Sequence, residues 1–87
     1  MKITLYDFNR GSQLERVTML ARHGSFLTFR SWGRFRVCLY HMGGFFAEVY
    51  FRVPDNDLSL TRGFKNTELL EPYLDEINLP LIKDQTD

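Results

Sequence analysis

The sequence almost lacks cysteine and has no long apolar run. Cys38 is the only cysteine, so the chain forms no internal disulfide and contains no CxxC site. Small secreted domains usually carry several cysteines. No stretch approaches the roughly 18–20 apolar residues that cross a bilayer, and Asp7 and Asn9 interrupt the opening "MKITLYDFNR" before it can form a secretion signal. These absences predict a cytoplasmic protein that does not associate with a membrane.

An excess of either charge is also absent, because 11 basic and 11 acidic residues give a net charge of zero. The charges are unevenly placed: residues 1–36 carry +5 and residues 54–87 carry −5. A dedicated binder of polyanions would show a clear basic excess. The distribution therefore favours contacts between the two halves, within one chain or between two copies.

Aromatic residues are plentiful, with eight Phe, four Tyr and one Trp. Each buried aromatic side chain removes about 150–250 Å² from water, which helps a short chain to build a core. The length of 87 residues predicts one domain over residues 1–87, with a partly ordered tail over residues 79–87.

Capping patterns indicate where helices begin. Ser12 and Glu15 have the spacing of a capping box, and the apolar residues that follow share one face, which predicts a helix over residues 13–23 that ends at a left-handed Gly24. Residues 2–8 fit either a short strand or a helical turn capped by Thr4 and Asp7, and we favour the turn.

A second helix is predicted near the C-terminus. Asn66 or Thr67 would cap it, and Leu70, Tyr73, Leu74 and Ile77 would form its apolar face.

Between the helices the apolar pattern alternates with a period of two in four short runs separated by turn-like residues. Short connections require antiparallel pairing. The sequence therefore predicts an α+β domain: a four-stranded antiparallel meander with an N-terminal helix and a C-terminal helix packed on one face.

The register is predicted from the requirement that one face be apolar. A two-residue turn at Gly43 and Gly44 would mix Glu48 with apolar residues, whereas a three-residue loop would collect the apolar residues on one face. We therefore expect the three-residue loop. The same argument applied to the first hairpin, which contains "FRSWGRFR", puts Leu27, Phe29 and Phe35 on the core face.

This register leaves a second face that is rich in aromatic and arginine side chains, the types enriched at protein interfaces. Glu48 would lie there between Arg36 and Arg52 as an ion ladder. Alternatively, one chain terminus covers this face and makes it a second core. The candidate partner-binding residues are Phe26, Arg30, Trp32, Arg36, Tyr40, Phe46, Glu48, Tyr50 and Arg52.

The histidine and cysteine residues do not form a catalytic or metal-binding pattern. His23 is interpreted as a cation at a helix end, and His41 and Cys38 point to opposite faces of one strand, so they form no pair. We expect no catalytic residue, no metal and no cofactor, and hence no enzyme.

The sequence therefore predicts a small intracellular protein-interaction module. Its partner would be a second copy, forming a homodimer, or another protein. The alternative is a single-stranded nucleic-acid binder, which would stack bases on aromatic side chains beside arginines. The residues of this alternative are Phe26, Arg30, Trp32, Arg36, Tyr40 and Tyr50.

Overall fold

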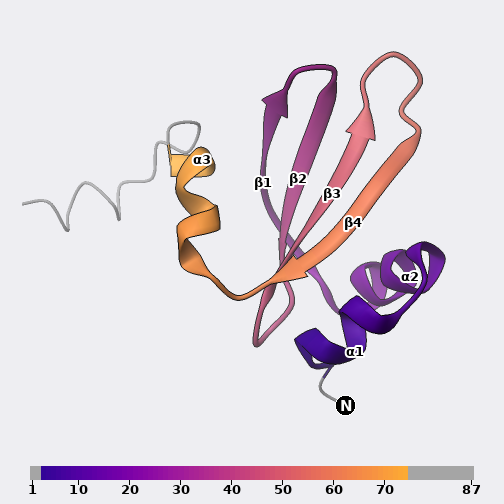
Figure 1. The fold of residues 1–87 in the computed structure, drawn as a ribbon, viewed down its shortest axis with the longest axis vertical. Coiled ribbons are helices and arrows are strands. Elements are labelled where there is room, and N and C mark those ends of the chain that lie inside the picture. Colours follow the sequence, from indigo (N-terminus) through magenta and orange to yellow (C-terminus); the bar gives the residue numbers. More distant parts are fainter. Residues whose placement is uncertain (1–2, 75–87) are drawn as a thin grey trace, which may run out of the picture.

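A computed structural model describes residues 3–74 of the chain and shows four antiparallel strands in one open sheet, in the order β1-β2-β3-β4 (Figure 1). This confirms the α+β class and the meander. Ile77 and the tail over residues 79–87 lie outside the described residues. The elements are α1 (Leu5–Arg10), α2 (Gln13–His23), β1 (Ser25–Trp32), β2 (Phe35–His41), β3 (Phe46–Arg52), β4 (Leu58–Phe64), a 3-10 helix η1 (Thr67–Leu70) and α3 (Glu71–Leu74).

The predicted caps form the helix starts. Thr4 and Asp7 make a reciprocal capping box on α1, so the helical turn, rather than a strand, occupies this segment. Ser12 and Glu15 make a second box on α2, whose bounds are those predicted. Gly24 was expected to be left-handed, but its φ is −87°. A Cβ on Gly24 would lie 2.7 Å from the Leu20 carbonyl oxygen, so close approach is what requires glycine there.

The predicted three-residue loop between β2 and β3 is wrong. Met42 donates its N–H to the carbonyl of Phe45 at 2.8 Å across a two-residue turn, and Gly43 takes a φ of +98°. Val37 is therefore opposite Tyr50. In the β1–β2 hairpin, Phe29 pairs with Cys38 and Trp32 with Phe35, so Phe29 and Phe35 lie on opposite faces.

The physical reason is that both faces of the sheet are covered, so neither has to be purely apolar. We name the side under α1 and α2 the N-terminal face; its core is Phe8, Leu20, Met42, Phe45, Ala47 and Val49. The other side, under η1 and α3, is the C-terminal face; its core is Val37, Leu39, Phe64 and Tyr73. Figure 1 shows the helices on opposite sides of the sheet, not packed together on one face as expected.

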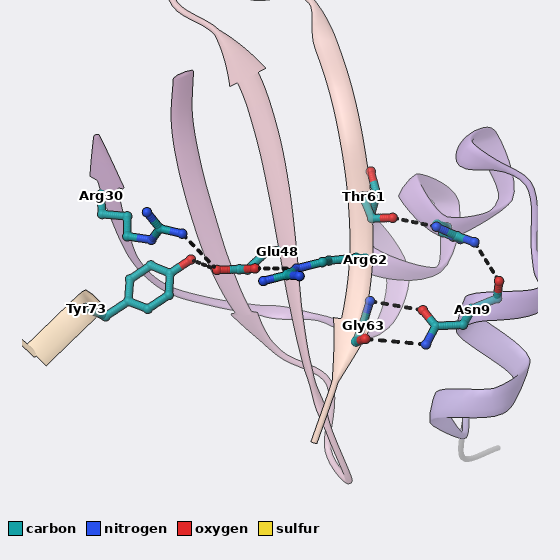
Figure 2. A network of polar contacts seen from close by, with 8 residues as sticks. Asn9, Arg30, Glu48, Thr61, Arg62, Gly63 and Tyr73 are labelled. Carbon is teal, nitrogen blue, oxygen red and sulfur yellow. Dashed lines mark hydrogen bonds and ion pairs between the residues drawn. The ribbon is translucent and has the colours of Figure 1, made fainter. Parts of the chain in front are cut away.

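Side chains from the helix pair cover the outer edge of β4. Asn9 pairs with the backbone of Gly63 in both directions, accepting its N–H at 3.0 Å and donating to its carbonyl at 3.4 Å. Gln13 donates to the Ser59 carbonyl at 3.2 Å, and Arg16 to the Thr61 carbonyl at 2.6 Å. These amide and guanidinium groups take the place of a neighbouring strand along this edge, and Figure 2 shows the contacts made at Thr61 and Gly63.

Gly63 provides a test of this packing, because a Cβ there would lie 2.8 Å from Leu5 Cδ1 and 3.0 Å from Phe8 Cδ2. We expect Gly63→Ala to lower the free energy of unfolding by about 1–2 kcal/mol through overpacking, as measured by urea denaturation. In a double-mutant cycle, Leu5→Ala should relieve part of this loss. Purely additive effects would mean that the contact with α1 is not the cause.

Candidate protein-interaction surface

Glu48 is the most buried charge in the described part of the chain. It lies on β3 with no solvent exposure, and its side chain points to the C-terminal face. Arg62 Nε lies 2.8 Å from Oε1, Tyr73 donates its hydroxyl to Oε2 at 2.5 Å, and Arg30 Nη2 lies 3.6 Å from Oε2 (Figure 2). Both carboxylate oxygens are thus satisfied by donors from β1, β4 and α3.

The expected ladder of Glu48 with Arg36 and Arg52 is wrong. The register places Arg36 on the N-terminal face, opposite Ser31, whereas Glu48 faces the other way. Arg52 pairs instead with Asp55 at 3.6 Å in the exposed connection after β3. Sequence reasoning included Arg30 among the candidates but missed Arg62 and Tyr73.

The electrostatics of this cluster follow from its burial. Burial and the adjacent Glu48 carboxylate raise the pKa of Tyr73 well above its ordinary value, which keeps the hydroxyl protonated as a donor. For Arg62, burial is the largest single cause and lowers the pKa, but the hydrogen bond to Glu48 and the nearby negative charge, chiefly that of Glu48, together outweigh it and raise the pKa. The Arg30 guanidinium carbon also lies 5.2 Å from the centre of the Tyr73 ring. Tyr73 therefore fastens α3 to the sheet.

The two-residue turn and the covering helices divide the predicted binding face. Phe26, Arg36 and Tyr40 lie on the N-terminal face, whereas the other six predicted residues lie on the C-terminal face. Phe46 and Tyr50 pack against the core under η1 and α3 and are half-buried. The C-terminal segment therefore covers this part of the second face, as in the alternative expectation, and does not leave it open for binding.

An exposed apolar surface lies along β1. Among its residues, Phe26 is 55% exposed, Leu27 49%, Phe29 47% and Trp32 58%. The helix pair packs mainly against β4, at the opposite edge of the sheet (Figure 1). Together with two polar neighbours these residues line the β1 edge on both faces, and we call this edge the β1 surface. Phe26, Phe29, Arg36 and Tyr40 lie on the N-terminal face, Trp32 lies on the C-terminal face, and Leu27 lies at the bulge between Phe26 and Thr28.

Aromatic contacts order the side chains of the β1 surface. Phe26 meets Tyr40 edge-to-face with ring centres 5.6 Å apart, and the Arg36 guanidinium lies 5.2 Å from the Phe29 ring centre. Trp32 stacks on Phe35 at 6.0 Å on the other side of the sheet. The aromatic groups are therefore held in place before any partner arrives, which reduces the ordering cost of binding.

An apolar groove of about 510 Å³ continues the β1 surface between α2 and the sheet. Phe26 and Tyr40 form one wall, and Leu20, Phe51 and Leu58 contribute to the rest. This groove and the exposed side chains of Phe26 and Phe29 make one apolar region on the N-terminal face, whereas Trp32 lies on the C-terminal face.

The histidine and cysteine side chains do not form a reactive cluster. Cys38 is opposite Phe29 on the N-terminal face, whereas His41 is opposite Phe46 and contacts its ring. Burial raises the pKa of Cys38, which favours the neutral thiol over the nucleophilic thiolate. Within residues 3–74 no three side chains of His, Cys, Asp or Glu gather where they could hold a metal ion.

Comparison of the chain with protein-family models, with curated proteins and with solved structures gives no significant match. None of the helices in the described part of the chain is long and apolar enough to span a membrane.

Glu48→Gln tests the buried cluster. Removing the charge leaves Arg30 and Arg62 facing a neutral amide in a buried site, so we expect the free energy of unfolding to fall by about 2–4 kcal/mol, out of the roughly 5–10 kcal/mol typical of a chain this size. Asp55→Asn, which removes the partner of the exposed Arg52, is the matched control and should cost less than about 1 kcal/mol. Similar losses in both variants would contradict this role for Glu48.

Tyr73 gives the protein a specific alkaline sensitivity. The unfolded chain releases the Tyr73 proton above pH of about 10, whereas the folded chain retains it, so stability falls as the pH rises. The contribution of this one group is about 1.4 kcal/mol per pH unit. Urea denaturation between pH 9 and 11.5 should therefore show a shallower loss of stability for Tyr73→Phe than for the unmodified protein. Equal slopes in the two proteins would exclude Tyr73 as the cause.

Proposed function

We propose that this protein is a small intracellular protein-interaction module that associates with a second copy of itself through the β1 surface. One observation carries the proposal: four large apolar side chains of one edge strand, Phe26, Leu27, Phe29 and Trp32, are each about half exposed. They lie on both faces of the same edge, and exposed large apolar side chains gathered in this way mark interaction sites in soluble proteins.

The chemistry of the β1 surface suits a protein partner. Tyr, Trp, Phe and Arg are enriched in interface cores, and Trp32, Arg36 and Tyr40 supply the polar groups of such a surface. Of the residues predicted from sequence, Phe26, Trp32, Arg36 and Tyr40 stay in the proposal. Arg30 and Glu48 belong to the buried cluster on the C-terminal face, where their ion pair connects β1 to β3.

A second copy is the partner that the charges favour. The whole chain has no net charge, so two copies approach without overall repulsion. A partner selected by charge would instead require an excess of one sign on the β1 surface, where Arg36 is the one ionic side chain.

Single-stranded nucleic acid is the second candidate, favoured by one feature of the hairpin end. Trp32, Arg34, Arg52 and Pro54 line a shallow hollow of about 470 Å³, which joins an aromatic platform to two arginines. Glu48, which would repel phosphates on an open face, is buried and paired with Arg30 and Arg62.

Sedimentation velocity over a concentration series tests self-association. At high micromolar concentration we expect a mass of twice the 10.3 kDa of one chain. Leu27→Lys should weaken the dimer at least about tenfold, because it places a charge in an apolar interface while leaving both cores untouched. Leu14→Lys is the control, since Leu14 is an exposed leucine on α2, away from the β1 surface, and should not change the mass.

A monomeric mass at every concentration would overturn the proposal. If oligonucleotides also quench the fluorescence of Trp32 at low salt, where stacking and phosphate contacts are strongest, nucleic acid becomes the favoured partner. Because Trp32 is the sole tryptophan, the signal reports directly on the β1 surface.

A further inference from the structure

The two helical covers of the sheet are attached to it in different ways. Asn9, Gln13 and Arg16 of the helix pair each donate a hydrogen bond to the backbone of β4. The opposite cover is the C-terminal segment, residues 67–74, which consists of η1 and α3. Within the described part of the chain, its one hydrogen bond to the sheet runs from the Tyr73 hydroxyl to Glu48. The attachment of this segment therefore depends strongly on a single side chain.

The C-terminal segment is ordered by docking on the sheet. η1 and α3 each span four residues, far fewer than the roughly 12–15 at which an isolated helix becomes stable in water. Tyr73 is the one buried side chain of the segment, while Leu69 and Leu70 are half-buried against the core of the C-terminal face. Regions that bury few apolar side chains open at a low free energy. The segment can thus leave the sheet while the strands stay folded.

The site that holds Tyr73 is built from the strands alone. Glu48 is paired with Arg62 at 2.8 Å and with Arg30 at 3.6 Å, and neither pair involves the C-terminal segment. The Arg30 guanidinium lies 5.2 Å from the ring centre of Tyr73, where it meets the aromatic ring. A carboxylate that accepts a hydroxyl, next to a guanidinium beside the ring, matches the chemistry of a tyrosine side chain. The strands therefore present a tyrosine site that the same chain fills.

We propose that the C-terminal face is a peptide-binding site, that residues 67–74 are its tethered occupant, and that a partner protein displaces them with a helical turn of the same chemistry. The partner presents a tyrosine preceded by leucines three and four positions earlier, the spacing of Tyr73 from Leu70 and Leu69. Anchors at this spacing are how a helix docks in a groove. This proposal concerns a different partner and does not depend on self-association through the β1 surface.

The charges favour an acidic partner. Glu68 and Glu71 are the charged residues of the C-terminal segment, and both are exposed. Beneath the segment, the two guanidinium groups of Arg30 and Arg62 and the one carboxylate of Glu48 leave a charge of +1. Opposite charges on two surfaces speed their encounter and disfavour wrong partners. The partner therefore resembles the segment in charge as well as in its apolar anchors.

Tethering sets the affinity that the partner experiences. A tethered segment competes at an effective concentration in the millimolar range, and the apparent affinity for a partner is reduced by the small fraction of molecules in which the site is open. Removing the hydroxyl of Tyr73 weakens the tethered segment and leaves Glu48 available. A partner that carries its own tyrosine therefore gains from this change.

Peptide binding to Tyr73→Phe tests the proposal. A fluorescein-labelled peptide with the sequence of residues 65–74, KNTELLEPYL, should bind this variant at least about tenfold more tightly than the unmodified chain in fluorescence anisotropy. The reason is that only the tethered competitor has lost its hydrogen bond to a charged group. Tyr6→Phe is the matched control, because Tyr6 is 71% exposed on α1, and it should bind the peptide as the unmodified chain does.

A second peptide separates the hydroxyl from the rest of the motif. A Tyr73→Phe version of the peptide should bind the variant chain more weakly than the tyrosine peptide does. Equal affinity of all three chains for the tyrosine peptide, equal binding of the two peptides, or no binding at millimolar peptide would overturn the proposal.

Hydrogen exchange tests the opening in the unmodified protein. The amides of Leu69 and Glu71 are hydrogen-bonded within their own segment, to Asn66 and Glu68. They should exchange at least about tenfold faster than the amides that join β2 to β3, because the segment opens by itself. Tyr73→Phe should accelerate them further and leave α2 unchanged. Exchange of the segment at the rate of the strands, or no response to Tyr73→Phe, would contradict the proposal.

Other occupants of the uncovered face give different results. If the tyrosine peptide fails to bind while a single-stranded oligonucleotide binds Tyr73→Phe and not the unmodified chain, the face takes nucleic acid and a peptide partner is wrong. If Leu27→Lys, which disrupts the β1 surface, still forms dimers that the peptide dissociates, a second copy supplies the turn. That result would overturn the separate partner.

Discussion

The buried carboxylate of Glu48 is the interaction on which the rest of this structure depends. A carboxylate without exposure is tolerated only when its charge is balanced and its oxygens are hydrogen-bonded. Here the balance comes from Arg30 on β1 and Arg62 on β4, with Tyr73 from α3 completing the set. One side chain thus connects the central strand β3 to both edge strands and to the C-terminal segment.

The helix starts and the order of the elements were predictable from the sequence, because both are local properties. The capping boxes of Thr4 with Asp7 and of Ser12 with Glu15 act over three residues, and so do the short turns that require an antiparallel meander. The register was not predictable by the argument used, which assumed that a single face is apolar. Because α3 covers the second face, apolar residues are needed on both, and Glu48 can take a core position once it has partners.

The predicted set of binding residues differs from the exposed set in the structure for the same reason. The predicted set mixed residues of two faces, so Phe46, Glu48 and Tyr50 proved to be core or supporting residues. Leu27 and Phe29 were missed because they were assigned to the core. One signal was available: Glu48 lies between the apolar residues Ala47 and Val49 of β3. A carboxylate buried there needs its charge balanced and its oxygens hydrogen-bonded, here by arginines from strands far apart in the sequence.

The hydrogen bonds from Asn9, Gln13 and Arg16 to β4 have a consequence for stoichiometry. A sheet with two open edges would add copies at both ends and grow into a fibre, since each new molecule would present another template. With β4 sealed by the molecule's own helices, growth is possible at one edge alone. The N-terminal helix pair thereby acts as a terminator of assembly and limits any association through β1 to a closed pair.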